Sequence, residues 1–193
     1  MEAILNALQN ADGWILLFIQ NHLRFDELTP WVIRFTKLGN YGLIWIVISL
    51  LLLIPKKTRR AGILSIVALV ASLCITNFLL KNYVARVRPY EVVSGLTSLL
   101  GPVSEYSFPS GHASAGFAAA TVINKNCRKW LGWPCVILAC LLSLSRLYVG
   151  VHYPTDVICG AIIGILIGLI VFWLFGEKKY KKRARRARRR RRR

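Results

Sequence analysis

The chain has 193 residues, of which 55% are hydrophobic, and a formal net charge of +19. Residues 178–193 hold 13 of the 27 lysines and arginines, so residues 1–177 carry 14 basic and 8 acidic groups and a net charge of only +6. A very apolar body joined to a short basic tail excludes a soluble enzyme, a disordered protein and a soluble nucleic-acid-binding domain. We expect the tail to stay solvated.

Residues 1–37 mix apolar and charged side chains, and their uncharged stretches are too short to span a bilayer. We expect an interfacial helix around residues 2–23 and a second helix that starts near Thr29 and Pro30, because proline suits the first helical turn. The glycine-containing stretch 39–42 predicts a bend. The start of the chain lacks the basic region of a cleavable signal peptide, so an internal span is expected to direct export.

Long uncharged runs follow at residues 38–55, 61–80 and 157–176. Each is close to the roughly 20 residues that a helix needs to cross about 30 Å of hydrocarbon. Shorter apolar segments at 110–124 and 131–145 add two more candidate spans, of which the first is rich in small residues and suited to packing among other helices.

The sequence therefore predicts an all-α fold, a polytopic transmembrane helix bundle with five spans. The number becomes six if residues 14–37 also cross. We divide the chain into interfacial or partly embedded N-terminal helices (1–37), a transmembrane core (38–176) and a polybasic tail (177–193). Three basic connections, at 55–60, 124–130 and in the tail, place that side in the cytoplasm by the positive-inside rule. The long segment 81–109 and the turn 146–156 then lie on the outer face.

This outer face gathers most of the ionisable groups of the core, and charge near a membrane marks a site by default. They are Lys81, Arg86, Arg88, Glu91, Glu105, His112, Arg146, His152 and Asp156. Cations around two histidines repel a metal ion and attract a multiply charged anion, of which phosphate is the commonest. The sequence therefore predicts an anion site that needs neither a metal nor a cofactor.

Local spacing agrees with an anion site. Ser110 is a good N-cap, and Gly111 lets an anion approach the free amides at a helix N-terminus. His152 and Asp156, four residues apart, suit a nucleophile or base whose second ring nitrogen is held by a carboxylate. His112 is then the candidate proton donor to a leaving oxygen.

Three motifs carry a resemblance to a known family: Lys81-x6-Arg88-Pro89, Pro109-Ser110-Gly111-His112, and Ser145-Arg146-x5-His152-x3-Asp156. Together they resemble the three-part signature of the type 2 phosphatidic acid phosphatase superfamily, complete and in order. The resemblance covers roughly residues 40–176. It implies a helical membrane enzyme that removes phosphate from lipid phosphates or diphosphates without a metal.

The resemblance also implies residue roles. His152 is similar to the nucleophile that forms a phosphohistidine, with Asp156 orienting it, and His112 to the acid that protonates the leaving group and later activates water. The phosphate cradle it implies consists of Lys81, Arg88, Ser110, the amide of Gly111 and Arg146. We interpret Arg86, Glu91 and Glu105, which lie outside the signature, as loop or rim residues.

Two substrates stay open, undecaprenyl diphosphate and a phosphatidylglycerophosphate or phosphatidic acid, with a slight preference for the polyprenyl lipid. The alternative function is a non-catalytic protein that binds or transports lipid headgroups with the same charged cluster. For the tail we expect anionic membrane lipids, and no nucleic acid, as its partner, because its basic residues lack interleaved stacking aromatics apart from Tyr180.

Overall fold

The computed structural model describes residues 2–176, and the predicted basic tail at 178–193 lies outside them. The described part is helical. Its α-helices are α1 Glu2–Leu23, α2 Thr29–Lys37, α3 Leu43–Leu53, α4 Arg59–Ser72, α5 Lys81–Val84, α6 Pro89–Val92, α7 Gly111–Asn126, α8 Lys129–Tyr148 and α9 Pro154–Val171. Shorter helical segments are the 3₁₀ turn η1 Asn40–Gly42 and the π-helical η2 Leu73–Leu80 and η3 Phe172–Gly176.

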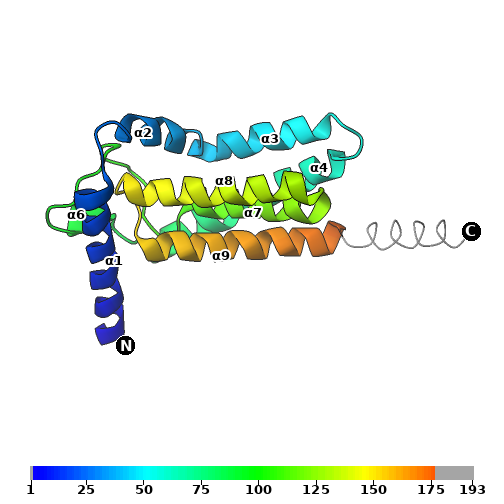
Figure 1. Ribbon diagram of the computed structural model, residues 1–193. Helices are drawn as coiled ribbons and strands as arrows, with labels where there is room; N and C mark the ends of the chain where they lie inside the picture. The colour runs from blue at the N-terminus through cyan, green and yellow to red at the C-terminus, as the bar shows by residue number, and fades with distance from the viewer. Residues whose placement is uncertain (1, 177–193) are drawn as a thin grey trace, which may run out of the picture.

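The long helices form a bundle, and α1 crosses one end of it (Figure 1). α7 is the central helix, with α4, α8 and α9 packed against it. The long connection between α5 and α7, which contains α6, lies at the same end of the bundle as α1. The all-α fold and the predicted helices at 2–23 and from Thr29 are confirmed.

Three segments of the described chain are long and apolar enough to cross a membrane: Arg59–Val92, Lys129–Tyr148 and Pro154–Phe175. A fourth is available if Thr29–Lys37 and Asn40–Leu53, bent by 51°, are one broken span. The predicted bend at 39–42 is present, and α3 beyond it has only 11 residues and reaches spanning length only together with α2. The bend comes from left-handed backbone at Tyr41 (φ 53°) and Gly42 (φ 70°).

Helix α7 is shorter than these spans, with 16 residues, and is enclosed by its neighbours. Ala113, Ala118, Ala119 and Ala120 are completely buried. Small side chains let the surrounding helices approach closely, as expected for a helix that packs among others and not against lipid. The total of five or six spans stays a prediction.

The tightest contact in the bundle joins α9 to α7. Gly160, Gly164 and Gly168 face the α7 backbone, and a Cβ atom placed on them would lie 2.6, 2.3 and 2.8 Å from the carbonyl oxygens of residues 110, 114 and 118. A side chain of any size would separate the helices, so the three glycines are required for this packing. The contact fixes the start of α7 beside the start of α9.

We predict that Gly164→Ala destabilises the protein by about 1–3 kcal/mol, because the added methyl must displace the Ser114 carbonyl oxygen. Thermal unfolding in detergent measures the change. Ile162→Leu, on an exposed position of the same helix, is the matched control and should unfold like the wild type. An unchanged midpoint for Gly164→Ala would show that the two helices tolerate separation.

Candidate active site

The residues singled out by the three motifs come together at the end of the bundle where α7 and α9 begin and α8 ends. A cavity of about 770 Å³ opens there. Its lining includes Lys81, Arg88, Gly111, His112, Arg146 and His152. The other two predicted residues, Ser110 and Asp156, are completely buried.

The start of α7 brings three of these residues into place. Ser110 occupies the N-cap position, as predicted, but its side chain makes no cap hydrogen bond, and its buried Oγ has no partner. Its amide donates instead to the Asp156 carbonyl oxygen at 3.1 Å. A Cβ on Gly111 would lie 3.0 Å from Asn77 Oδ1, a tight contact that the Asn77 side chain would have to relieve by moving. The Ser110 hydroxyl thus has no hydrogen-bond partner among the described residues.

His112 is held by the last turn of α2 and by the segment that follows it. Its Nε2 lies 3.3 Å from the Thr36 carbonyl oxygen. A Cβ on Gly39 would lie 2.5 Å from His112 Cδ2, so the imidazole packs directly on the Gly39 backbone. The N-terminal segment thus forms one wall around this histidine.

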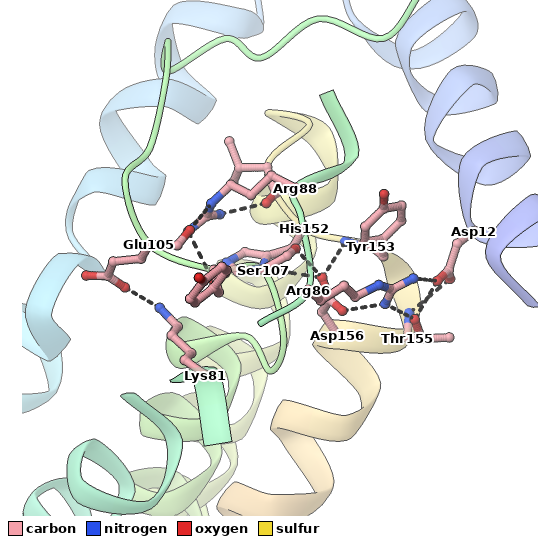
Figure 2. A network of polar contacts seen from close by, with 12 residues as sticks. Asp12, Lys81, Arg86, Arg88, Glu105, Ser107, His152, Tyr153, Thr155 and Asp156 are labelled. Carbon is pink, nitrogen blue, oxygen red and sulfur yellow. Dashed lines mark hydrogen bonds and ion pairs between the residues drawn. The ribbon is translucent and has the colours of Figure 1, made fainter. Parts of the chain in front are cut away.

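The predicted His152–Asp156 pair is present. Nδ1 of the buried imidazole lies 3.7 Å from Asp156 Oδ2, close enough for electrostatic attraction but longer than a hydrogen bond. The same carboxylate oxygen accepts hydrogen bonds from Ser107 Oγ at 2.5 Å and from the Tyr153 amide at 3.0 Å (Figure 2). Because Nδ1 faces the carboxylate, Nε2 is the ring nitrogen left for chemistry.

Burial lowers the pKa of His152 to about 4, with Arg88 and Arg146 acting in the same direction and Asp156 opposing. The imidazole is therefore neutral at physiological pH, the form that a nucleophile or base requires.

Glu105 lies on the loop across the cavity. Its hydrogen bond with Lys81 lowers the pKa of its carboxyl group.

Three cations surround this imidazole, each held differently. Lys81 Nζ pairs with the half-exposed carboxylate of Glu105. Arg88 donates to the Glu105 and Val151 carbonyl oxygens, both at 2.7 Å, and so ties the α6–α7 connection to the backbone next to His152. Arg146 donates to Thr36 Oγ1 at 2.9 Å, but its buried Nε has no partner within residues 2–176.

Sequence reasoning missed several residues of this site. Thr36 is fully buried and accepts hydrogen bonds from both Ser145 and Arg146. Ser107 binds the carboxylate of the His–Asp pair. A single threonine or serine gives no pattern in a sequence. Asp12 did give a signal, as an isolated carboxylate in an otherwise apolar stretch of an N-terminal helix.

Arg86, which we interpreted as a loop or rim residue, has a larger role than that interpretation gives it. It lies in a loop, as expected, but its side chain is only 23% exposed and points inward to Asp156 and Asp12. Glu105, by contrast, has a half-exposed side chain at the edge of the cavity, and Glu91 is exposed.

Comparison with known proteins gives the family. Residues 61–180, more than half of the chain, match the sequence model of the PAP2 superfamily. The chain belongs to the PAP2 superfamily.

An undecaprenyl-diphosphatase of Sulfolobus acidocaldarius is 36% identical over 69% of this chain and 65% of its own length, so the PAP2 chain spans slightly less than two thirds of that relative. A decaprenylphosphoryl-5-phosphoribose phosphatase of Mycobacterium tuberculosis is 32% identical over 75% of this chain and 79% of its own length.

The crystal structure of a transmembrane PAP2-type phosphatidylglycerolphosphate phosphatase from Bacillus subtilis superposes with a TM-score of 0.71. It is 29% identical in sequence, and the match covers 88% of this chain and 86% of that one. The spanning helices and the transmembrane relative agree that this PAP2 chain is an integral membrane protein.

We predict that the His152 imidazole stays neutral when the pH falls from 8 to about 5, because its lowered pKa places protonation near 4. Nitrogen-15 NMR of histidine-labelled protein in detergent reads the ring nitrogens directly, and His152→Gln identifies the signal. A titration midpoint near the ordinary value of about 6.5 would contradict the buried, cation-flanked environment.

Proposed function

We propose that this chain is a metal-independent membrane lipid phosphatase, which hydrolyses a lipid phosphate or diphosphate through a phosphohistidine at His152. The observation that carries the proposal is the composition of one cavity. Its polar end holds three cations and two histidines, and it continues between α3 and α4 along aliphatic side chains. These are Ile46, Leu50, Ile66, Leu69, Val70 and Leu73.

Both ends of the cavity suit a phosphorylated lipid. Phosphoryl transfer depends mainly on positioning and on neutralising charge, which Lys81, Arg88 and Arg146 supply. In the described part of the chain, Arg146 Nε and Ser110 Oγ are buried without partners, and a buried unsatisfied polar group costs about 1–3 kcal/mol. A bound phosphate would satisfy both. The aliphatic end offers an apolar surface to a hydrocarbon chain.

The reaction follows from the two histidines. Nε2 of neutral His152 attacks phosphorus, the bond from phosphorus to the leaving oxygen breaks, and His112 gives that oxygen its proton. The carboxylate of Asp156 stabilises the cationic imidazole that results. Water then attacks the phosphohistidine, His112 takes its proton, and the nitrogen–phosphorus bond breaks to release phosphate.

As substrate we favour undecaprenyl diphosphate or a similar polyprenyl diphosphate over phosphatidylglycerophosphate and phosphatidic acid. Two relatives with more than 30% identity are named for polyprenyl substrates. The structural neighbour from Bacillus subtilis is named for phosphatidylglycerolphosphate, so that lipid stays the second candidate.

We place the site on the outer face of the cell membrane and the polybasic tail in the cytoplasm. Lys56 and Lys57 lie in the connection between α3 and α4, and Arg128 lies in the connection between α7 and α8, which follows Lys125 in the last turn of α7. Both connections are at the end of the bundle opposite α1 and the start of α9 (Figure 1). Short basic connections stay on the cytoplasmic side, so the cavity faces outward.

We predict that purified protein releases phosphate from one or more of undecaprenyl diphosphate, phosphatidylglycerophosphate and phosphatidic acid in detergent with EDTA present. His152→Ala should lower release by roughly 10³-fold or more, since it removes the nucleophile. His22→Ala is the matched control, because this histidine is exposed on α1. Equal release by His152→Ala would exclude the nucleophile assignment, and binding of the lipids without turnover would favour a headgroup-binding or transport protein.

Orientation gives a separate prediction. In a background without the five native cysteines, a cysteine at exposed Ser104 should react with a membrane-impermeant maleimide on intact cells. A cysteine at exposed Lys57 should react only after permeabilisation. The reverse pattern would place the cavity in the cytoplasm.

A further inference from the structure

Outside the signature, one polar cluster reaches the candidate catalytic pair. Arg86, in the loop between α5 and α6, lies between two buried carboxylates (Figure 2). Its Nη1 is 2.5 Å from Asp156 Oδ1 and its Nη2 is 2.9 Å from Asp12 Oδ2. Asp12 comes from α1, in the N-terminal part of the chain that the signature does not include.

The guanidinium is fixed on several sides. Nη1 also donates to Thr155 Oγ1 at 2.8 Å, and the Tyr153 ring lies under the guanidinium carbon, 3.8 Å from the ring centroid. Asp12 accepts further hydrogen bonds from the Thr155 amide, at 3.1 Å, and from the Thr155 hydroxyl. An arginine held in this way can define the position of a carboxylate, because both of its donor nitrogens have a fixed direction.

The position of Asp156 depends on these contacts. His152 Nδ1, at 3.7 Å, is too far away to hold the carboxylate by a hydrogen bond. Ser107 and the Tyr153 amide bind one of its oxygens, and Arg86 binds the other. Without Arg86 the carboxylate keeps contacts on a single oxygen and can rotate away from the imidazole.

Asp12 has a different effect. Arg86 alone would cancel the charge of Asp156, and a neutral pair stabilises a cationic imidazole poorly. Asp12 shares the same guanidinium, so the three side chains together keep one net negative charge. A phosphorylated His152 carries the positive charge that balances it. In a buried setting, charges are tolerated when they are paired in this way.

We propose that Arg86 and Asp12, here named the Asp12–Arg86 clamp, are positioning residues that hold Asp156 toward His152 and leave its negative charge available for the phosphohistidine. The proposal rests on the proposed lipid phosphatase function for its kinetic consequences. Its structural part, the placement of Asp156 beside His152, does not depend on turnover.

Kinetics of phosphate release test the clamp. Arg86→Gln should lower kcat by about 10–100-fold, the usual effect of losing an outer partner of a reacting group, with KM changed less than about 3-fold because Arg86 does not line the cavity. Arg86→Lys should recover part of the loss. Asp12→Asn should lower kcat by about 10-fold alone and have no further effect in the Arg86→Gln background, since its influence passes through Arg86.

Arg24→Gln is the matched control. Arg24 also anchors the N-terminal segment, through Tyr148 and Thr97 carbonyl oxygens, and it makes no contact with Asp156. It should keep kcat within about 2-fold of the wild type. If Arg24→Gln lowers kcat as much as Arg86→Gln, docking of α1 alone explains the effect and the clamp is overturned. Where Arg86→Gln does not fold, the near-isosteric Asp12→Asn carries the test.

A second measurement separates the clamp from the phosphatase function. Nitrogen-15 signals of His152 should move in Arg86→Gln and stay unchanged in Arg24→Gln, whether or not the protein turns over lipid. Unchanged His152 signals in folded Arg86→Gln would overturn the clamp. A wild type that shows the expected signals but releases no phosphate from any lipid would overturn the proposed function and leave the clamp in place.

Discussion

The contact between α7 and α9 is the constraint on which the rest of the site depends. Three glycines of α9 lie so close to the α7 backbone that a methyl group would displace carbonyl oxygens. This approach sets the Ser110 amide on the Asp156 carbonyl oxygen at 3.1 Å. Two motifs that are more than 30 residues apart in the sequence therefore share one hydrogen bond. Helices separated by larger side chains would hold the same residues too far apart.

The electrostatics of the site follow from its burial. Lys81, Arg88, Arg146, His152 and Asp156 are all less than 10% exposed, and charged groups are rarely buried without partners. Lys81 is accordingly paired with a carboxylate, Arg88 with backbone oxygens and Asp156 with Arg86. Arg146 donates to the Thr36 hydroxyl, and its Nε has no partner among the described residues. The same burial keeps His152 uncharged while three cations lie nearby. One environment thus favours both an anionic ligand and a neutral nucleophile.

The helical fold and the set of eight motif residues that meet at one end of the bundle could be predicted from the sequence. The length of the apolar segments and the spacing within each motif can be read directly from the linear chain. Prediction failed where three-dimensional packing decides the outcome. The stretch 39–42 predicted a bend, but the left-handed backbone at Tyr41 and Gly42 leaves α3 with only 11 residues, so that it reaches spanning length only together with α2.

Arg86 shows the same limit for the site. Its loop position was predictable, but whether a loop arginine faces solvent or a buried carboxylate depends on where α1 docks. The role of Thr36 could not be predicted for a related reason. Its hydroxyl accepts a hydrogen bond from Arg146, but it lies on a helix 110 residues earlier in the chain. Contacts of this kind combine common residue types at no fixed spacing.

Because α1 and α2 contribute side chains to the site, the smallest complete site includes both of these helices. The recognisable family region begins at residue 61. A fragment trimmed to that region would keep every signature residue, yet it would lose Asp12, which engages Arg86, and Thr36, which engages Arg146. The region that matches the family is therefore smaller than the part of the chain that builds the site. Domain exchange between relatives would have to carry the first two helices along with the motifs they support.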